Sequence, residues 1–569
     1  MKSKEIKNNP RFDQGLGDLH NQEHIHWNRR QFLGAGGMLS LGSVMLGGLP
    51  ASPLLSPELL ASFAGSNQNR ILVLIKMFGG NDGLNMVIPH SEAVGNEFYR
   101  NTLRPNISLK HGTHYDDSML LSGYGTPDWA LPSQLSGFMP LWKEGKMNII
   151  QNVGYPNQDY SHFTSDRYWS TASDSIDDKT NNSGWMGRFL EQDYPAMEDT
   201  PTAVPPAMRI GYYNDYLFLS PQARQTELVF YDANQFYQFA QRGALHSTDG
   251  LGNCEIGDEK NFLRQLTNNS LRYSEKIYQA YNKSKQYSTP PANQGYNNIA
   301  NDLGIVSRLI RGGLGTRVYL VAMGGFDTHE SQMNIHPRLM LELNNAVTWF
   351  LDDLKKDNAQ TDVAVMTYSE FGRTIRENGS QGTDHGNLST MFMFGEKLSG
   401  GFHGNPMVLD DAGLSTGGTL LFFEDAKQKA TDFRSVFGST LQQWMCVDDE
   451  LVDFSMGSNY KRLALFDVEA CSGIENKGSN NNAVLLGHNP DLYNPSQIVI
   501  KFSQLVGSET ALYIKSINGK TIAKLHDKYT PAGSYNLIFD PLQWKVPRGE
   551  YIYQLNSGGK IYARKFNIF

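Results

Sequence analysis

The sequence has few cysteines, no excess of positive charge and no nucleotide-binding motif. Its three cysteines, in 569 residues, stand far apart and in no Cys-x-x-Cys pattern. This argues against a disulfide framework or a cysteine-based zinc site, and an odd count allows at most one internal bridge. The formal net charge of −8 argues against a nucleic-acid binder, which would carry a basic surface. No Walker loop and no dinucleotide glycine motif after a strand occurs, so nucleotide cofactors are not indicated.

The N-terminal segment, residues 1–64, is predicted to be an export signal. Arg29 and Arg30 precede a run, rich in glycine and leucine and charged only at Glu58, that extends to about Leu60. This pattern resembles a twin-arginine signal. The alternative is a transmembrane anchor, but six glycines between Gly34 and Gly48 make a poor spanning helix. We therefore expect export through the twin-arginine machinery and no stable membrane span after processing.

Four apolar runs rich in valine and isoleucine follow. Such runs, bounded by glycine, are typical of strands that are buried on both faces of a parallel sheet. They are Arg70–Phe78, Met147–Val153, Thr316–Met323 and Thr361–Tyr368. Helical stretches lie between them, the clearest being Pro337–Leu354, where apolar residues recur at three-to-four spacing. We expect an α/β fold with a mostly parallel sheet flanked by helices.

A polar cluster follows each of these runs. An open α/β sheet places its ligand site at the carboxyl ends of its strands, so we expect the clusters around Asp82, Ser161-His162, the third run and the fourth run to converge. Carboxylates and imidazoles are the ligands that hold Zn²⁺, Mn²⁺, Mg²⁺ or Ca²⁺. The metal ligands that the last two clusters predict are Asp327, His329, Glu370, Asp384 and His385.

Two residues near these ligands have open roles. His162 is a candidate ligand, a candidate acid for the leaving group, or a packed histidine. Arg373 is a candidate to pair bidentately with a bound oxyanion, or a surface charge on a helix.

Five motifs, in order, resemble one known family. They are LIKMFGGNDGLNMVIP, NVGYPNQDYSHFTSDRYW, MGGFDTHESQ, YSEFGRTIRENGSQGTDHGN and TDFRSVFGSTLQQW. They look like the twin-arginine-exported family numbered fifteen-oh-one among the domains of unknown function, which is placed in the alkaline phosphatase-like superfamily together with the sulfatases. The resemblance covers roughly residues 70–455 and implies an alkaline phosphatase-like domain over residues 70–460.

The resemblance adds two expectations about the site. It implies that Asp82 is a metal ligand, with an Asx-type turn as the alternative. It implies that Ser161 opens a helix as the nucleophile, with an ordinary helix cap as the alternative. The chain also departs from the superfamily, because Asp327 and His329 are two residues apart rather than four, and Glu370 stands where relatives often carry an Asp-His pair. No Cys-x-Pro-x-Arg stretch occurs, so the chain cannot use the formylglycine mechanism of the usual sulfatases.

The C-terminal part is predicted to be a small β-sandwich over residues 490–569, after a linker over residues 461–489. Six short strand-like runs alternate there with turn signals such as Asn518-Gly519. The tail resembles a type IX secretion sorting domain in Tyr493-Asn494-Pro495, in the run Ser516–Lys520 and in the run Pro547–Tyr553. This implies passage through the type IX machinery and a secreted or outer-surface location. The alternative is a carbohydrate-binding or adhesive sandwich.

Together these observations predict an exported hydrolase of phosphate or sulfate esters. The protein would bind one or two divalent ions, Zn²⁺, Mn²⁺, Ca²⁺ or Mg²⁺, and its substrate would be a small-molecule or polymer ester. The alternative is a secreted or surface binding protein that retains the alkaline phosphatase-like fold without catalysis.

Overall fold

The computed structural model describes most of the chain from residue 70 onward. The described residues are 45–46, 70–123, 128–156, 158–173, 183–193, 204–211, 213, 215–220, 226–241, 271, 273–285, 287–292, 297–387, 389–405, 409, 430–467, 483–490, 497–504, 507–516, 520–531, 533–557 and 560–568. The predicted export signal, apart from residues 45–46, lies outside them. Residues 468–482 of the predicted linker and the tail motif Tyr493-Asn494-Pro495 also lie outside.

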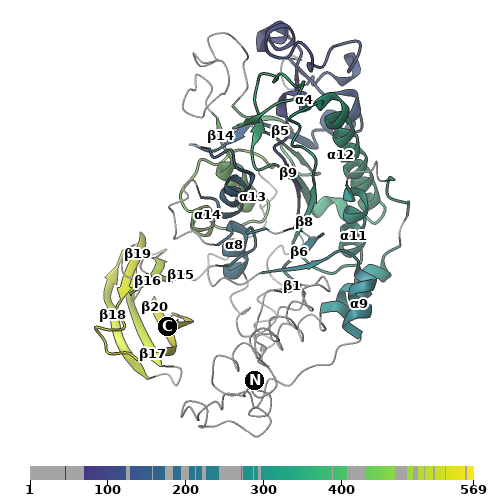
Figure 1. Ribbon diagram of the computed structural model, residues 1–569. Helices are drawn as coiled ribbons and strands as arrows, with labels where there is room; N and C mark the ends of the chain where they lie inside the picture. Colours follow the sequence, from purple (N-terminus) through teal and green to yellow (C-terminus); the bar gives the residue numbers. More distant parts are fainter. Residues whose placement is uncertain are drawn as a thin grey trace, which may run out of the picture.

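A ten-stranded sheet runs through the larger part of the molecule (Figure 1). Its strand order is β1-β7-β6-β8-β2-β9-β12-β5-β13, with β14 paired to β5. The strands are β1 Met45–Leu46, β2 Ile71–Met77, β5 Met147–Gly154, β6 Ala207–Ile210, β7 Glu227–Phe230, β8 Val318–Met323, β9 Val363–Tyr368, β12 Ser389–Phe394, β13 Gly401–Gly404 and β14 Thr431–Asp432. The four predicted strands are therefore confirmed as β2, β5, β8 and β9.

These four strands all run in one direction. Strands β8 and β9 flank β2 and pair with it in parallel. Strand β12 is antiparallel to both β9 and β5, so β5 has the same direction as β9. The mostly parallel sheet confirms the predicted α/β class, and the four polar clusters leave the sheet at one side, which we call its carboxyl end.

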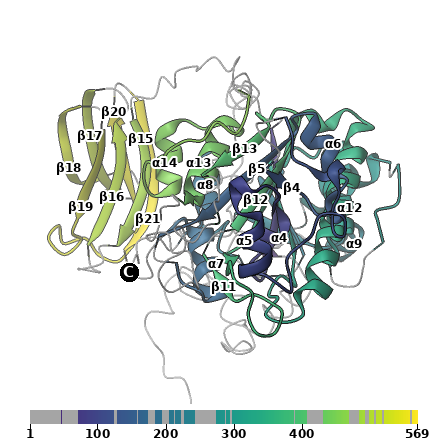
Figure 2. The ribbon, with the colours of Figure 1, turned by 90° about the horizontal axis from the view of Figure 1, so that it is seen from above.

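Helices cover both faces of the sheet (Figure 2). Alternate side chains of β2 enter different cores, because Val73 and Ile75 pack in one buried cluster while Leu72 and Leu74 pack in another. The first cluster includes α9 Ala233–Gln241, α11 Ile299–Arg311 and α12 Gln332–Lys355. The second includes α7 His162–Thr171, α8 Trp185–Asp193, α13 Phe433–Gln443 and α14 Asp449–Met456. Burial on both faces explains why the strands are continuously apolar.

Short elements complete this part of the chain. They include α4 Gly83–Met86, α5 Asn96–Phe98, α6 Phe138–Lys143, the pair β3 Ile88–Pro89 and β4 Trp129–Ala130, and the pair β10 Gly372–Arg373 and β11 His385–Gly386. No helix among the described residues is long and apolar enough to cross a membrane.

The C-terminal part forms two antiparallel sheets around a core of its own. One consists of β15 Ala483–Pro490, β16 Ile498–Gln504 and β19 Gly533–Phe539. The other consists of β17 Ser508–Ser516, β18 Thr521–Thr530, β20 Gly549–Ser557 and β21 Lys560–Ile568. Phe502, Leu512 and Tyr553 are buried between them, as a sandwich requires.

The predicted linker is wrong at its C-terminal end. Residues 483–490 pair with β16 as strand β15, so the boundary at residue 490 falls at the end of a strand. Glycine and proline in this run indicated a loop, but β15 is an edge strand with an irregularity between Leu485 and Gly487. Edge strands and bulges accommodate both residue types.

The buried acid Asp302 in α11 provides a test of this core that is independent of any activity. Burial raises the pKa of the Asp302 carboxyl from 3.8 to about 7. Between these values the unfolded chain has released the proton that the folded chain keeps, so this group lowers stability as the pH rises from about 4 to about 7. We expect Asp302→Asn to raise the free energy of unfolding at pH 8, by up to about 4 kcal/mol, and by less at pH 5.

Thermal unfolding at both pH values measures this difference. Asp352→Asn, at an exposed position of α12, is the matched control and should change neither midpoint. A gain for Asp302→Asn that is equal at pH 5 and pH 8 would contradict the prediction.

Candidate metal centre

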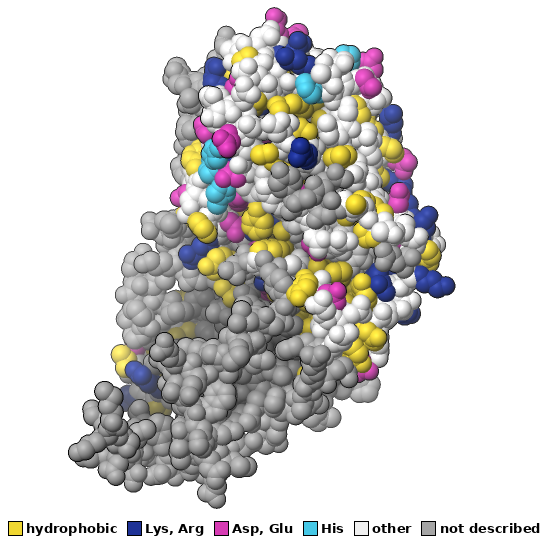
Figure 3. Space-filling view, turned by 45° about the vertical axis from the view of Figure 1, so that its right-hand side comes forward, with side chains coloured by type: hydrophobic (Ala, Val, Ile, Leu, Met, Phe, Trp, Pro, Cys, Tyr) yellow, Lys and Arg dark blue, Asp and Glu magenta, His cyan; other side chains and the backbone are white. Residues whose placement is uncertain are grey.

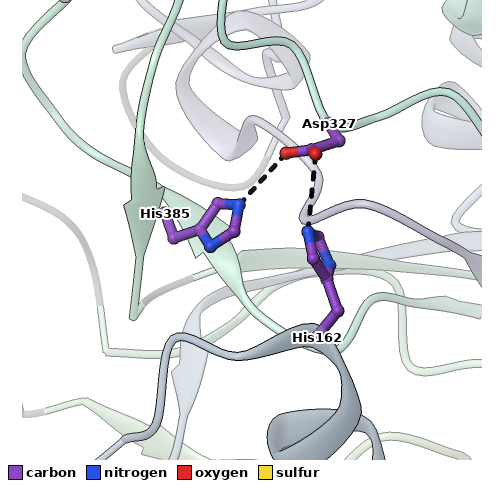
Figure 4. Close-up of side chains that lie close together, drawn as sticks. All are labelled: His162, Asp327 and His385. Atoms are coloured by element: carbon purple, nitrogen blue, oxygen red, sulfur yellow. Dashed lines mark hydrogen bonds and ion pairs between the residues drawn. The ribbon is translucent and has the colours of Figure 1, made fainter.

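Three side chains meet at the carboxyl end of the sheet (Figure 4). Asp327 lies in the loop after β8, His162 begins α7 after β5, and His385 lies in β11. One ligand atom of each lies within 4.8 Å of the others. Side chains of three of the four predicted clusters thus meet here, although only some of the predicted ligands face the centre.

The Asp327 carboxylate is surrounded by three imidazoles. Its Oδ1 atom lies 3.0 Å from Nε2 of His329 and 3.1 Å from Nε2 of His385, and its Oδ2 atom lies 3.5 Å from Nε2 of His162. The Nε2 atoms of His329 and His385 are themselves 3.0 Å apart. Ligand atoms of His162, Asp327 and His385 all lie within 4.8 Å of one another, and His329 Nε2 adjoins those of Asp327 and His385.

The other ring nitrogen of each histidine contacts an oxygen. The Nδ1 distances are 2.8 Å from His162 to Glu370 Oε1, 3.0 Å from His329 to Asp384 Oδ1, and 2.7 Å from His385 to the Tyr160 carbonyl. A carbonyl or an ionised carboxylate can only accept a hydrogen bond, so each Nδ1 carries the proton. In a neutral ring Nε2 then presents a lone pair, which is the arrangement of histidines that ligate a metal, whereas a protonated His385 Nε2 donates to Asp327 Oδ1 at 3.1 Å.

The two carboxylates that hold histidines are ionised. Burial alone would raise the pKa of Glu370, but hydrogen bonds from His162 and from the Gly79 N–H outweigh it, and the pKa lies below its ordinary value. Burial would also raise the pKa of Asp384, but hydrogen bonds from Asn378 and His329 lower it. The predicted ligands Glu370 and Asp384 thus reach the site as partners of His162 and His329, not as groups that face Asp327.

The donor set fits a metal ion. Lone pairs on two nitrogens 3.0 Å apart repel each other, and so do those of the neighbouring carboxylate, unless a proton or a cation lies between them. Three imidazole nitrogens and one carboxylate oxygen are a ligand set typical of first-row divalent ions. The site is also open, since the Asp327 side chain is 45% exposed while that of Glu370 is 2% exposed. Figure 3 shows histidine and acidic side chains together at the molecular surface.

Arg373 lies beneath Asp327 with a fully buried side chain. Its guanidinium donates to Gly80 O at 3.0 Å, Thr383 O at 3.2 Å, Phe326 O at 3.0 Å and Asp327 Oδ1 at 2.6 Å. Burial would raise the pKa of Asp327, but the His385 hydrogen bond and the Arg373 charge hold it below its ordinary value. Arg373 therefore belongs to strand β10 and fixes Asp327, whereas the sequence suggested an oxyanion contact or a surface charge on a helix.

Asp82 lies outside the cluster, with partners of its own. Its carboxylate caps α4 by accepting from the Leu84 N–H and pairs with the buried Arg104 through two contacts of 2.6 and 2.9 Å. Gln332 donates a fourth hydrogen bond to it. Burial would raise the pKa of Asp82, but the Arg104 charge lowers it. The predicted alternative, an Asx-type turn, describes this geometry.

Ser161 occupies the N-cap position of α7 without capping it. The backbone is extended there, and the side chain makes no capping hydrogen bond, while the Ser161 N–H donates to Asp159 Oδ1 at 2.6 Å. The Ser161 side chain is exposed. Its hydroxyl, directly before the ligand candidate His162, is therefore not engaged as a cap.

Sequence patterns gave no sign of three contributors. Arg104 precedes a proline in a loop, Gln332 lies in a helix, and the Tyr160 contribution is a backbone carbonyl. Each acts on a residue far away in the chain, so no local spacing could reveal it.

Part of the chain matches a known protein family. Residues 150–412, which contain His162, Asp327 and His385, match the family described as protein of unknown function DUF1501. A comparison with curated proteins found no match.

Similar solved structures include three enzymes. The lipoteichoic acid synthase LtaP from Listeria monocytogenes has a TM-score of 0.28 and 9% identity, covering 59% of this chain and 68% of that chain. The PsFucS1 sulfatase from Pseudoalteromonas sp. has a TM-score of 0.29 and 10% identity, with coverage of 88% and 91%. The alkaline phosphatase from the Antarctic bacterium TAB5 has a TM-score of 0.23 and 9% identity, with coverage of 58% and 94%. The resemblance to family fifteen-oh-one is confirmed over residues 150–412.

Proposed function

We propose that this chain is a metal-dependent hydrolase of phosphate or sulfate esters, with one divalent ion held by His162, His329, His385 and Asp327. One observation carries the proposal. Three Nε2 atoms, each with its Nδ1 already committed to an oxygen, surround a single carboxylate at the carboxyl end of the sheet.

The donor types favour Zn²⁺ among the ions that the sequence suggests. Zn²⁺ binds histidine nitrogen and carboxylate oxygen readily, while Mg²⁺ and Ca²⁺ take oxygen ligands almost exclusively. Three nitrogens out of four donors therefore point away from the oxygen-preferring ions. The open side of the site leaves room for a substrate.

A bound divalent ion would supply a Lewis acid that polarises the ester and offsets the charge developing on its oxygens. The protein's own groups hold the ligands, since Glu370, Asp384 and the Tyr160 carbonyl orient the rings and Arg373 orients the carboxylate. The unpaired N–H groups of the first turn of α7 favour an anionic group beside Ser161.

Ser161 is the proposed nucleophile. Its hydroxyl oxygen would attack the phosphorus or sulfur atom, and the alcohol would leave with the proton. Water would then release phosphate or sulfate and restore the hydroxyl.

The proposal includes export to a secreted or outer-surface location through the twin-arginine and type IX machineries. Three features support it: the twin-arginine-like N-terminal segment, the two C-terminal sheets in the region that resembles a sorting domain, and a disulfide bond at Cys446. Disulfides persist mainly in oxidising compartments outside the cytoplasm.

A second candidate is a secreted or surface protein that binds a metal or a ligand without catalysis. It is favoured by the commitment of Arg373 to four acceptors within the protein, since the oxyanion contact expected of this arginine would require breaking them. Bound metal without turnover on any ester would support this candidate.

We expect the purified protein, equilibrated with Zn²⁺ and desalted, to retain about one ion per chain, as a single mononuclear site requires. His385→Ala and Asp327→Asn should each lose this ion, because each removes a ligand, and elemental analysis measures the loss. His403→Ala, a histidine in β13 whose contacts are with Gly400 and Ser399, is the matched control and should retain the ion. A wild-type protein that retains no metal would contradict the proposed metal centre.

We expect Ser161→Ala to lower kcat by about 100-fold or more on an aryl phosphate or aryl sulfate, because it removes the attacking oxygen. Zn²⁺ content should stay unchanged. Thr164→Ala, in the same helical turn, is the matched control and should stay within about twofold of wild type. Full activity in Ser161→Ala would assign the attack to water instead.

A further inference from the structure

A lysine with a fully buried side chain lies beneath the helix that carries His162. Lys76 belongs to β2, in the middle of the sheet, and its Nζ contacts two aspartates. Asp166 comes from α7, and Asp215 comes from the loop after β6, with a distance of 2.6 Å to Nζ. One buried cation thus joins a central strand, α7 and a loop.

Helix α7 is tied to the sheet by polar contacts on every turn. His162 contacts the Glu370 side chain, and Ser165 Oγ donates to the Glu370 carbonyl at 2.5 Å. Asp166 contacts Lys76. Ser170 Oγ donates to Asp215 Oδ1 at 3.0 Å. These positions, 162, 165, 166 and 170, share one helix face.

The inner face of α7 combines apolar packing with buried polar groups. Ser165, Ser170 and Thr171 are among its buried residues, beside Tyr168 and Trp169. Apolar packing is not directional, whereas ion pairs and hydrogen bonds fix both the rotation and the axial position of a helix. Tyr168 and Trp169 anchor α7 in the core, while its polar contacts define its rotation and axial position.

Stability alone does not account for a buried charge cluster of this kind. Removing charges from water is costly, and replacing a buried ion pair by apolar residues often leaves stability unchanged or raises it. Burial would lower the pKa of Lys76, but the charges of Asp166 and Asp215 raise it above its ordinary value. The lysine is thus charged at neutral pH, and its contacts are strong and directional.

We propose that Lys76 and Asp166 are positioning residues for the metal ligand His162. Their ion pair sets the place of α7, and the place of α7 sets the distance from His162 Nε2 to the Asp327 carboxylate. This inference rests on the proposed metal centre, so its test includes a direct measurement of metal binding by the wild-type chain.

The test removes the three charges together, so that none is left unpaired. In the full-length chain, the triple variant Lys76→Met, Asp166→Leu and Asp215→Asn is compared with the wild type. Competition with a chromogenic chelator measures the Zn²⁺ dissociation constant. The absorption spectrum of the Co²⁺-substituted protein reports the ligand geometry, which a purely structural role would leave unchanged.

The matched control removes another buried ion pair, Arg311 and Asp353, through Arg311→Met and Asp353→Leu. Both side chains are buried, and the pair joins α11 and α12 on the opposite face of the sheet. We expect the triple variant to bind Zn²⁺ about 10- to 100-fold more weakly, as for other residues that orient a metal ligand, with an altered Co²⁺ spectrum. The control should match the wild type in both measurements.

The milder variant Asp166→Asn keeps the size of the side chain and a hydrogen-bond acceptor. It replaces the triple variant in the test if the triple variant does not fold. It should weaken Zn²⁺ binding by a smaller factor than the triple variant. Wild-type affinity and an unchanged Co²⁺ spectrum in the folded variants would overturn the inference, and so would equal weakening in the control. Absence of Zn²⁺ binding in the wild type would instead overturn the proposed centre itself.

Discussion

The ion pair between Asp327 and Arg373 is the interaction on which the candidate site depends. Arg373 is buried, and its guanidinium joins the segments after β2 and β8 to the strand that carries His385. Because a guanidinium stays protonated at any ordinary pH, Asp327 is kept ionised and in one orientation. Arg373 also pairs directly with His385 in the register of β10 and β11. Arg373 therefore orients the Asp327 carboxylate through its side chain and lies opposite His385 through its backbone.

The sequence predicts where the site lies because the relevant physics is local. Strands buried on both faces must be apolar, and polar groups that follow them must collect at the carboxyl end of the sheet. The role of each residue is not local. Whether Glu370 faces an ion or a histidine ring depends on His162, which is 208 positions away in the chain. Arg104, 22 positions beyond Asp82, decides in the same way that Asp82 is an ion-pair partner.

Element boundaries were missed for the same reason. Helix α12 begins at Gln332, five residues before the predicted start at Pro337, a residue type favoured in the first turn of a helix. The early start is stabilised from outside the helix, because the Ser331 and Gln332 N–H groups donate to the carbonyls of Ser380 and Gln381 at 3.0 Å. Free N–H groups at a helix start need such acceptors. The acceptors come from the same loop that leads to Asp384 and His385, so the helix start and the site depend on each other.

The two aspartates after β2 and β8 are neutralised in different ways, and this difference argues for one ion. Arg104 occupies both oxygens of Asp82 with both side chains buried. Arg373 occupies only Oδ1 of Asp327, and Oδ2 faces His162 on the open side. A cation at Asp82 would have to displace a buried guanidinium and leave it unpaired, which costs about 3 to 5 kcal/mol. At Asp327 no such pair has to break. Arginine thus provides the positive charge permanently at Asp82, and in the proposed centre only Asp327 has an oxygen left for a metal.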